Sequence, residues 1–268
     1  YKYKYIVWSE STRHEVSWQR LLTLPFVKWL LKHASGYIAI GTESKNYLVS
    51  LGASSSKIYT AFSTVDVDHF AHKSKITPSE KKKIRTNLSI PAGNTILLYT
   101  GQFIPRKNVL LLIQAIDLLP NNFTLLLIGY GPQEDLLRKY VQQHPEKSVV
   151  ILPHQEIDVL PRYYGIADIF ILPSNEETWG LVVNEALAAS LPVFVSNKVG
   201  SALDLVKTGI NGYVFDPTNV NELVSLVLQT TSKPGLMLRM SRASKNIIGN
   251  FTPKHAAESF YKCITHSN

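Results

Sequence analysis

The sequence is poor in sulfur and has no long apolar segment. Of its 268 residues, one is cysteine and two are methionine. The single thiol, Cys263, cannot form an internal disulfide, which excludes the small disulfide-stabilised class and favours a reducing compartment. Apolar runs such as Val109–Ile113 and Leu125–Ile128 are far shorter than the roughly 20 residues that cross a bilayer. We therefore expect a globular protein of the cytoplasm.

Acidic residues are outnumbered by basic ones. The chain has 20 Asp and Glu against 28 Lys and Arg, which gives a formal net charge of +8. Such a surplus favours anionic partners, including phosphates and acidic lipid surfaces. The sequence contains no zinc-ligand spacing, basic zipper or aromatic RNA-binding pattern, so net charge alone supports a nucleic-acid partner. We expect a phosphate-bearing ligand and no nucleic acid.

Apolar runs alternate with helical patterns along most of the chain, which predicts a parallel α/β sheet. The larger, second part has six such runs, and this number matches a six-stranded doubly wound domain. Domains of this kind bind ligands beyond the carboxyl ends of their strands. The six strands are expected at Thr95–Thr100, Phe123–Ile128, Val149–Leu152, Ile169–Leu172, Val193–Ser196 and Gly212–Phe215.

A shorter set of elements comes first. Strands are expected near Tyr3–Trp8, Tyr37–Ile40 and Lys57–Ala61, with helices near Trp18–Lys32 and Ser44–Leu51. We expect no regular element between these and the charged run Glu80–Arg85, which predicts a solvated helix. The division that follows is a first domain over residues 1–74, a second over 75–249 and a terminal helix within 250–268.

The stretch from Pro173 to Ala188 is the most informative part of the chain. It predicts a strand end, a turn and a helix, with Glu177 before the helix and Glu185 in its second turn. The amide of Leu181 and the carboxylate of Glu185 share one helix face, roughly 6 Å apart along the axis. A helix N-terminus suits a phosphate, and a carboxylate one turn further suits sugar hydroxyls. The geometry fits a nucleotide, although the spacing alone also fits a solvent-facing Glu185 and a Glu177 that only lies in a loop.

The whole stretch resembles the E-x7-E signature of retaining glycosyltransferases of the GT-B fold, the glycosyl transferases group 1. The similarity extends from about Ser35 to Phe260. In that class, two Rossmann-like doubly wound domains face each other across a cleft, and the donor nucleotide binds the C-terminal one. The resemblance implies a complete second domain, an N-terminal domain of which only the last third is present, and a final helix that packs back onto it. It also implies a nucleoside diphosphate sugar as donor, with no metal or other cofactor.

The segment from Thr100 to Asn108 follows a buried strand. Gly101 allows the backbone to turn tightly or approach a ligand. Arg106 and Lys107 are expected at a helix start, where cations are unfavourable unless an anion lies between them. The resemblance places both against the donor diphosphate, where they would stabilise the charge of the leaving group. Two solvated surface cations are the alternative.

Two further turns resemble donor-binding segments. The turn from Gly129 to Pro132 carries Tyr130 in place of the usual acid, and Pro132 suits a first helical position. Tyr130 is expected either to line the donor pocket or only to form the turn, and His154 either to contact the base or to lie in a plain loop. Trp179 replaces the usual Phe and is expected to pack.

The resemblance assigns a role to each site residue. Glu177 would lie beside the donor sugar and Glu185 would bind the ribose hydroxyls. A catalytic role falls to Arg106, Lys107 and Glu177. Donor binding is assigned to Gly101, Arg106, Lys107, Tyr130, His154, Glu177, Gly180, Leu181, Val182 and Glu185.

The first part offers less. The resemblance implies a histidine that supports the donor sugar and follows a strand of the first domain. Glu10 or His14 are the candidates at that place, and a surface histidine is the alternative interpretation of His14. The basic, amphipathic segment from Leu24 to His33 either docks at a membrane that carries a lipid-linked acceptor or packs into the core. A peripheral position at the inner face of the cell membrane therefore stays open.

These observations lead to one main expectation and one alternative. The main expectation is a retaining hexosyltransferase-type enzyme that moves a sugar from a nucleoside diphosphate sugar to a saccharide or lipid-linked acceptor, in surface polysaccharide or glycoconjugate assembly. The alternative is a nucleotide-binding fragment or degenerate relative without transferase activity. Intact Arg106, Lys107, Glu177 and Glu185 favour the enzyme, whereas the missing first-domain strands favour the fragment for these 268 residues alone.

Overall fold

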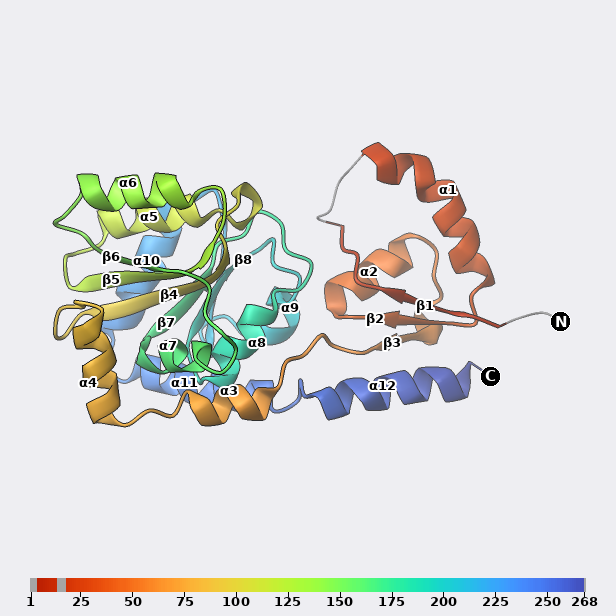
Figure 1. The fold of residues 1–268 in the computed structure, drawn as a ribbon. Coiled ribbons are helices and arrows are strands. Elements are labelled where there is room, and N and C mark those ends of the chain that lie inside the picture. The colour runs from red at the N-terminus through yellow and green to blue at the C-terminus, as the bar shows by residue number, and fades with distance from the viewer. Residues whose placement is uncertain (1–3, 14–17, 268) are drawn as a thin grey trace.

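The computed structural model describes residues 4–13 and 18–267 and arranges them as two units, each built on a parallel β-sheet (Figure 1). The N-terminal unit has a three-stranded sheet in the order β1-β2-β3. Its strands are β1 (Ile6–Ser9), β2 (Gly36–Ala39) and β3 (Ile58–Thr60). All three run parallel, as the alternation of strand and helix predicts.

Helices cover both faces of this small sheet. On one face, α1 (Trp18–His33) and α2 (Thr42–Ser50) bury a cluster that includes Leu31 and Leu48, and the turn η1 (Ser55–Lys57) leads into β3. The last helix of the chain, α12 (Pro253–His266), packs against β2 and β3 and buries Cys263 on the other face. The last helix of the chain therefore completes the core of the N-terminal unit.

The C-terminal unit has a six-stranded sheet in the order β6-β5-β4-β7-β8-β9. Its strands are β4 (Thr95–Gln102), β5 (Phe123–Tyr130), β6 (Ser148–Leu152), β7 (Ile169–Leu172), β8 (Val193–Ser196) and β9 (Gly212–Phe215). Every pairing is parallel, which confirms the expected doubly wound sheet. The strand order reverses between β4 and β7, and this is the place where such sheets bind ligands.

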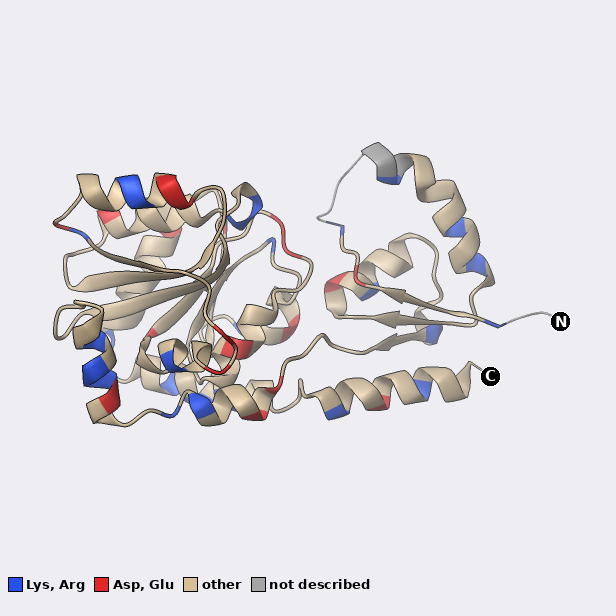
Figure 2. Ribbon diagram, viewed as in Figure 1, with Lys and Arg blue, Asp and Glu red and all other residues tan. Residues whose placement is uncertain are grey.

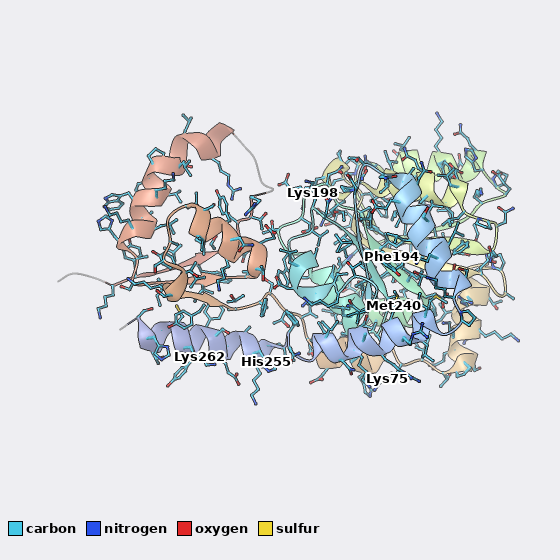
Figure 3. All side chains as sticks on the ribbon, turned by 180° about the vertical axis from the view of Figure 1, so that it is seen from behind. Lys75, Phe194, Lys198, Met240, His255 and Lys262 are labelled. Atoms are coloured by element: carbon cyan, nitrogen blue, oxygen red, sulfur yellow. The ribbon has the colours of Figure 1, made fainter. Side chains whose placement is uncertain are left out.

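Helices lie on both faces of the larger sheet (Figure 1). Helices α5, α6 and α10 cover one face, and α3, α7, α8 and α11 cover the other. Figure 3 shows this arrangement from behind, with Phe194 of β8 beneath the helices and Met240 on α11. The helices are α3 (Val67–Lys73), α4 (Pro78–Asn87), η2 (Pro105–Lys107), α5 (Val109–Leu118), α6 (Glu134–Gln143), α7 (Leu160–Ile166), α8 (Leu181–Ala188), α9 (Ala202–Leu205), α10 (Val220–Ser232) and α11 (Leu236–Ile248).

Capping residues explain two helix starts. Thr77 and Glu80 form a reciprocal capping box at α4, and Pro78 takes the first helical position. At α3, Asp66 accepts a hydrogen bond from the amide of His69 at 2.9 Å. Sequence patterns predicted α4 but no element at α3, because α3 has only seven residues and one fully buried side chain, Phe70. Since α3 packs against α7 and α8, we propose that the first domain ends before α3 rather than at residue 74.

The amphipathic segment within α1 is divided between core and surface. Leu31 is buried, whereas Phe26 and Trp29 are 62% and 58% exposed and stack on each other at 6.1 Å between ring centroids. Of the two alternatives for this segment, packing into the core therefore does not apply to these two side chains. Figure 2 shows basic residues and no acidic residue along this helix. Among the described residues, no helix is long and apolar enough to span a membrane.

Candidate functional site

A cavity of about 270 Å³ opens at the carboxyl edge of the larger sheet, beside the reversal of strand order. Five residues that the sequence singled out line it together: Gly101, Tyr130, His154, Val182 and Glu185. They come from four separate segments of the chain. The remaining lining residues are Thr100, Gln102, Ile128, Gly129 and Leu160.

Glycines let two strand ends meet beneath this cavity. A Cβ atom at Gly129 would lie 1.8 Å from the carbonyl oxygen of Gly101, and one at Gly131 would lie 2.5 Å from that of Phe103. Gly131 also has a φ of 152°, which disfavours any other residue. The close approach of β4 and β5 therefore depends on glycine, and Gly101 and Gly129 line the cavity without a side chain.

Glu185 is the acidic side chain of the cavity, and a buried hydroxyl chain orients it. The Tyr164 hydroxyl donates to Oε2 of Glu185 at 2.7 Å and lies 2.7 Å from Oγ1 of Thr100. Burial raises the pKa of Glu185, while the hydrogen bond from Tyr164 acts in the opposite direction. The carboxylate is thus fixed in a position from which its free oxygen can accept bonds from ligand hydroxyls.

Aromatic side chains form the rim of the same cavity. The rings of Tyr130 and His154 approach edge to face, with 6.1 Å between their centroids. Tyr130 ends β5 and is 54% exposed, and His154 lies on the exposed segment after β6. Two exposed rings at a pocket mouth suit a flat ligand group such as a nucleobase.

The start of α8 lies at the same edge. Gly180 precedes the helix with a φ of 90°, in the left-handed region, and as a glycine this N-cap residue has no side chain to bond the first amides. The amides of Leu181 and Val182 fall in the first turn, where the helix has no carbonyl partners for its N–H groups. Those amides and the positive end of the helix dipole favour an anion next to the Glu185 cavity.

Lys107 and Glu177 form an ion pair across two loops. The Lys107 ammonium contacts Oε2 of Glu177, and the two side chains are only 13% and 11% exposed. The amide of Asn175 donates to the carbonyl of Arg106 at 2.8 Å, which joins the same loops through their backbones. The Arg106 side chain is exposed. The structure therefore separates two adjacent cations: one is paired with a carboxylate and the other faces solvent.

Two expected helix starts are shifted. Arg106 and Lys107 lie in the 3₁₀ turn η2, and α5 begins at Val109 after Asn108. Asn108 has a left-handed φ of 54° and donates to the carbonyl of Pro217 at 3.0 Å, so it serves where a glycine would otherwise be favoured. Pro132 does not begin a helix, because α6 starts at Glu134.

Of the two first-domain candidates, only Glu10 is described, and it does not join this site. Glu10 is exposed and lines a separate cavity of about 290 Å³ in the N-terminal unit, between the end of β1, α1 and α2. His14 lies outside the described residues. Trp179 is buried at 4% exposure, in agreement with a packing role.

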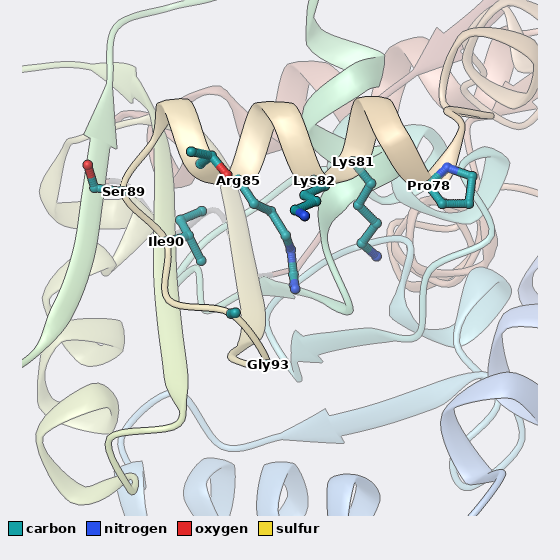
Figure 4. Close-up of a pocket in the computed structure, with 9 residues that line it drawn as sticks. Pro78, Lys81, Lys82, Arg85, Ser89, Ile90 and Gly93 are labelled. Atoms are coloured by element: carbon teal, nitrogen blue, oxygen red, sulfur yellow. The ribbon is translucent and has the colours of Figure 1, made fainter.

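A second, larger cavity of about 600 Å³ lies at the opposite end of the larger sheet (Figure 4). Lys81, Lys82 and Arg85 of α4 contribute to its walls. Arg85 donates to Oδ2 of Asp168 at 3.1 Å, and the same oxygen accepts the amide of Ile96, so this cation anchors α4 to the sheet. The cavity lies at the amino ends of the strands, away from every residue of the candidate site.

No group of three or more His, Cys, Asp or Glu side chains suited to a metal ion occurs among the described residues. The interpretation that the sequence has no Asp-x-Asp triplet to hold a metal is wrong, because Asp66 and Asp68 form one. Both carboxylates are exposed, and Asp66 caps α3. Sequence patterns do not indicate Tyr164, because a tyrosine within a short helix belongs to no motif. Its role follows only from the contact with Glu185.

This chain is similar in sequence to known glycosyltransferases. The sequence profile described as "Glycosyl transferases group 1" matches residues 80–247. D-inositol 3-phosphate glycosyltransferase from Mycolicibacterium smegmatis is 28% identical over 220 residues, which is 79% of this chain and 48% of the relative. O-antigen chain mannosyltransferase B from Escherichia coli is 35% identical over 139 residues, 50% of this chain and 36% of the relative. The chain thus spans about half the length, or less, of these relatives.

Two solved structures share the fold. Anabaena Alr3699/HepE in complex with UDP superposes with a TM-score of 0.85 at 19% identity, over 98% of this chain and 72% of that one. Sucrose-phosphate synthase from Thermosynechococcus elongatus gives a TM-score of 0.79 at 20% identity, over 99% and 69%. Both likenesses establish the GT-B arrangement of parallel α/β sheets.

Proposed function

The chain belongs to the glycosyl transferases group 1, and on that basis we propose that it is the donor-side part of a retaining enzyme that transfers a sugar from a nucleoside diphosphate sugar. One observation carries the proposal: a fixed carboxylate, a helix start with glycine at its N-cap and a cationic loop meet at one edge of the sheet. In this proposal Glu185 binds the ribose hydroxyls and the amides of Leu181 and Val182 bind phosphate.

The other groups of the site have complementary tasks. Arg106 and Lys107 stabilise the negative charge that develops on the departing diphosphate. Tyr130 and His154 hold the base at the rim. Glu177, held by Lys107, faces the transferred sugar.

We propose a transfer that requires no nucleophile from the protein. The acceptor oxygen bonds to the anomeric carbon on the face from which the diphosphate leaves. The bond from that carbon to the diphosphate oxygen breaks, and a phosphate oxygen takes the proton of the acceptor hydroxyl. No metal ion enters this scheme, because the two cations and the helix start supply the positive charge.

The acceptor is proposed to be a saccharide or a lipid-linked saccharide, in surface polysaccharide or glycoconjugate assembly. The E. coli relative is an O-antigen chain mannosyltransferase and a Salmonella typhimurium relative is a lipopolysaccharide N-acetylglucosaminetransferase, which supports this class. For a lipid-linked acceptor we propose peripheral contact with the cytoplasmic membrane face through Phe26 and Trp29 of α1, beside Lys28 and Lys32.

Calorimetric titration with a panel of nucleoside diphosphates tests the donor site and identifies the base. We expect one diphosphate to bind measurably to the 268-residue chain, and the matching nucleoside to bind much more weakly. Replacing both Arg106 and Lys107 with Ala should reduce affinity for the diphosphate about tenfold or more per residue and leave nucleoside affinity nearly unchanged. Equal losses for nucleoside and diphosphate would contradict the phosphate role.

A second function is nucleotide binding without sugar transfer. It is favoured by the coverage, since the chain spans about half the length of its curated relatives. Transfer requires both walls of the cleft, because the acceptor must be positioned against the donor and water excluded. Product analysis after incubation with the matching nucleotide sugar distinguishes the two: a glycosylated acceptor supports the enzyme, and diphosphate binding without product supports the binding module.

A further inference from the structure

Trp179 lies between Glu177 and Glu185 in the sequence, and its side chain packs against the N-terminal unit. Its indole is 4% exposed and packs beside Phe62, with 6.0 Å between ring centroids. A Cβ atom at Gly41, just before α2, would lie 2.3 Å from Cζ3 of this indole. The φ of Gly41 is extended, at 175°, so space rather than backbone conformation requires glycine there. The backbone of the N-terminal unit at Gly41 thus leaves no room for a side chain between itself and the indole.

A second contact joins the units at the next residue. Asp204 accepts a hydrogen bond from the amide of Thr42 at 2.9 Å and another from its hydroxyl at 2.5 Å. Thr42 is the first residue of α2, so a carboxylate of the C-terminal unit caps a helix of the N-terminal unit. Trp179 and Asp204 therefore hold two consecutive residues, Gly41 and Thr42.

The segments that carry these two side chains are joined to each other. The amide of Gly200 donates to the carbonyl of Glu177 at 2.8 Å, and the amide of Ser201 donates to that of Trp179 at 3.2 Å. A Cβ atom at Gly200 would lie 1.9 Å from the carbonyl oxygen of Thr178, so the two segments are in direct backbone contact. The loop that carries Glu177 and the segment that leads to Asp204 form one surface toward α2.

Trp179 also reaches α8. Its indole N–H donates to Oδ1 of Asn184 at 2.8 Å, and the amide group of Asn184 donates to the carbonyl of Ser63 at 3.2 Å. Ser63 lies on the segment between β3 and α3 that connects the units. Asn184 has no exposed surface and immediately precedes Glu185. A displacement of the N-terminal unit would therefore change contacts of both Trp179, near Glu177, and Asn184, next to Glu185.

We propose that Trp179 is a positioning residue that couples the N-terminal unit to the donor loop. In the arrangement seen here, Gly41 and Thr42 hold Trp179 and Asp204 and thereby fix the loop that presents Glu177. When the units separate, the loop loses this support, and contact with the transferred sugar weakens before contact with the nucleotide. The sugar-side consequence rests on the proposed function of Glu177, whereas the mechanical coupling does not.

Gly41→Ala tests the coupling, since its methyl group must displace the rigid indole. Gly249→Ala is the matched control: its added Cβ would lie 3.4 Å from the nearest atom, the carbonyl oxygen of Asn246, and its φ of −57° suits alanine. Hydrogen exchange measured by mass spectrometry should be faster over residues 175–184 in Gly41→Ala and unchanged over β4 and β5. The control should match the parent chain in both regions.

Donor titration gives the second readout. Gly41→Ala should weaken binding of the intact nucleotide sugar by about threefold or more, while bare diphosphate affinity changes by less than about twofold. Parallel losses for both ligands would overturn the positioning role.

The exchange result decides the coupling separately from the proposed function. If the parent chain binds no nucleoside diphosphate, the proposed function fails while exchange still tests the coupling. Unchanged exchange over residues 175–184 in a folded Gly41→Ala would overturn the coupling even if donor binding is intact. Should Gly41→Ala not fold, Thr42→Val removes the hydroxyl donor to Asp204, and Trp179→Phe removes the indole donor to Asn184. At least one of these must accelerate exchange over the same residues, and parent-like exchange in both would overturn the coupling.

Discussion

The hydroxyl of Tyr164 donates to Oε2 of Glu185 at 2.7 Å, so helix α7 holds a carboxylate of helix α8 in place. Burial raises the pKa of the Tyr164 hydroxyl well above its usual value, and the negative charge of Glu185 adds to this effect. The tyrosine therefore keeps its proton at neutral pH, and its hydrogen bond favours the charged form of the glutamate.

Tyr164→Phe should raise the pKa of Glu185 further, because it removes the hydrogen bond that lowers it. Nucleoside diphosphate binding should weaken, and its loss on acidification should begin at a higher pH than in the parent chain. Calorimetric titration across pH measures both effects. Tyr163→Phe on the same helix is the control, and its profile should be that of the parent.

Glu185→Gln should make the ligand-free chain more stable at neutral pH. Burial raises the folded-state pKa of this group above its usual 4.5, so the folded state retains the proton longer than the unfolded state. The parent chain therefore loses stability as pH rises from about 4.5 through the folded pKa, and the amide variant lacks this loss. Urea unfolding across that range checks the sign; a parent chain that gains on the variant as pH rises would contradict it.

Lys107→Ala should destabilise the fold, whereas Arg106→Ala should not. Loss of Lys107 leaves the carboxylate of Glu177 unpaired at 11% exposure, which costs about 3 kcal/mol. Arg106 is exposed, so its removal should change stability by less than about 0.5 kcal/mol. Denaturant unfolding of both variants measures the contrast. Adding Glu177→Gln to Lys107→Ala should restore part of the loss, since no buried charge then remains.

The two glutamates should separate in binding experiments. Glu185→Ala should reduce affinity for the bare nucleoside diphosphate by about tenfold or more, because charge-assisted bonds to ribose hydroxyls are lost. Glu177→Ala should spare that affinity and reduce only the extra affinity for the intact nucleotide sugar. If Glu177→Ala weakens the bare diphosphate as much as Glu185→Ala does, the two roles are assigned wrongly.

The sequence predicted the larger sheet well because its signals are local. Each strand is a short apolar run, and the strand ends carry residues such as Gly101 and Tyr130 that mark turns. The position of Glu185 in the second turn of its helix was likewise predicted, since it follows from counting residues beyond Gly180. Patterns of this kind need no knowledge of distant contacts.

Partners that come from distant segments could not be predicted. The pairing of Lys107 with Glu177 spans 70 residues, and that of Thr42 with Asp204 spans 162. Neither pair has a characteristic spacing, and each depends on how loops meet after the sheets form. The division of α1 into a buried Leu31 and an exposed Trp29 has the same origin. Periodicity predicts which side chains share one face of a helix, but not which element packs against that face.

The chain passes between the two units twice, once through residues 61–66 and again just before α12 (Figure 1). The two passages are fastened side by side, since the Thr64 hydroxyl donates to the carbonyl of Phe251 and the rings of Phe62 and Phe251 lie 4.6 Å apart. A unit joined by one connecting segment can rotate in any direction. A unit joined by two adjacent segments retains chiefly rotation about the line through both segments. We therefore expect any opening of the units to be chiefly a rotation about that line, which would separate Gly41 from Trp179.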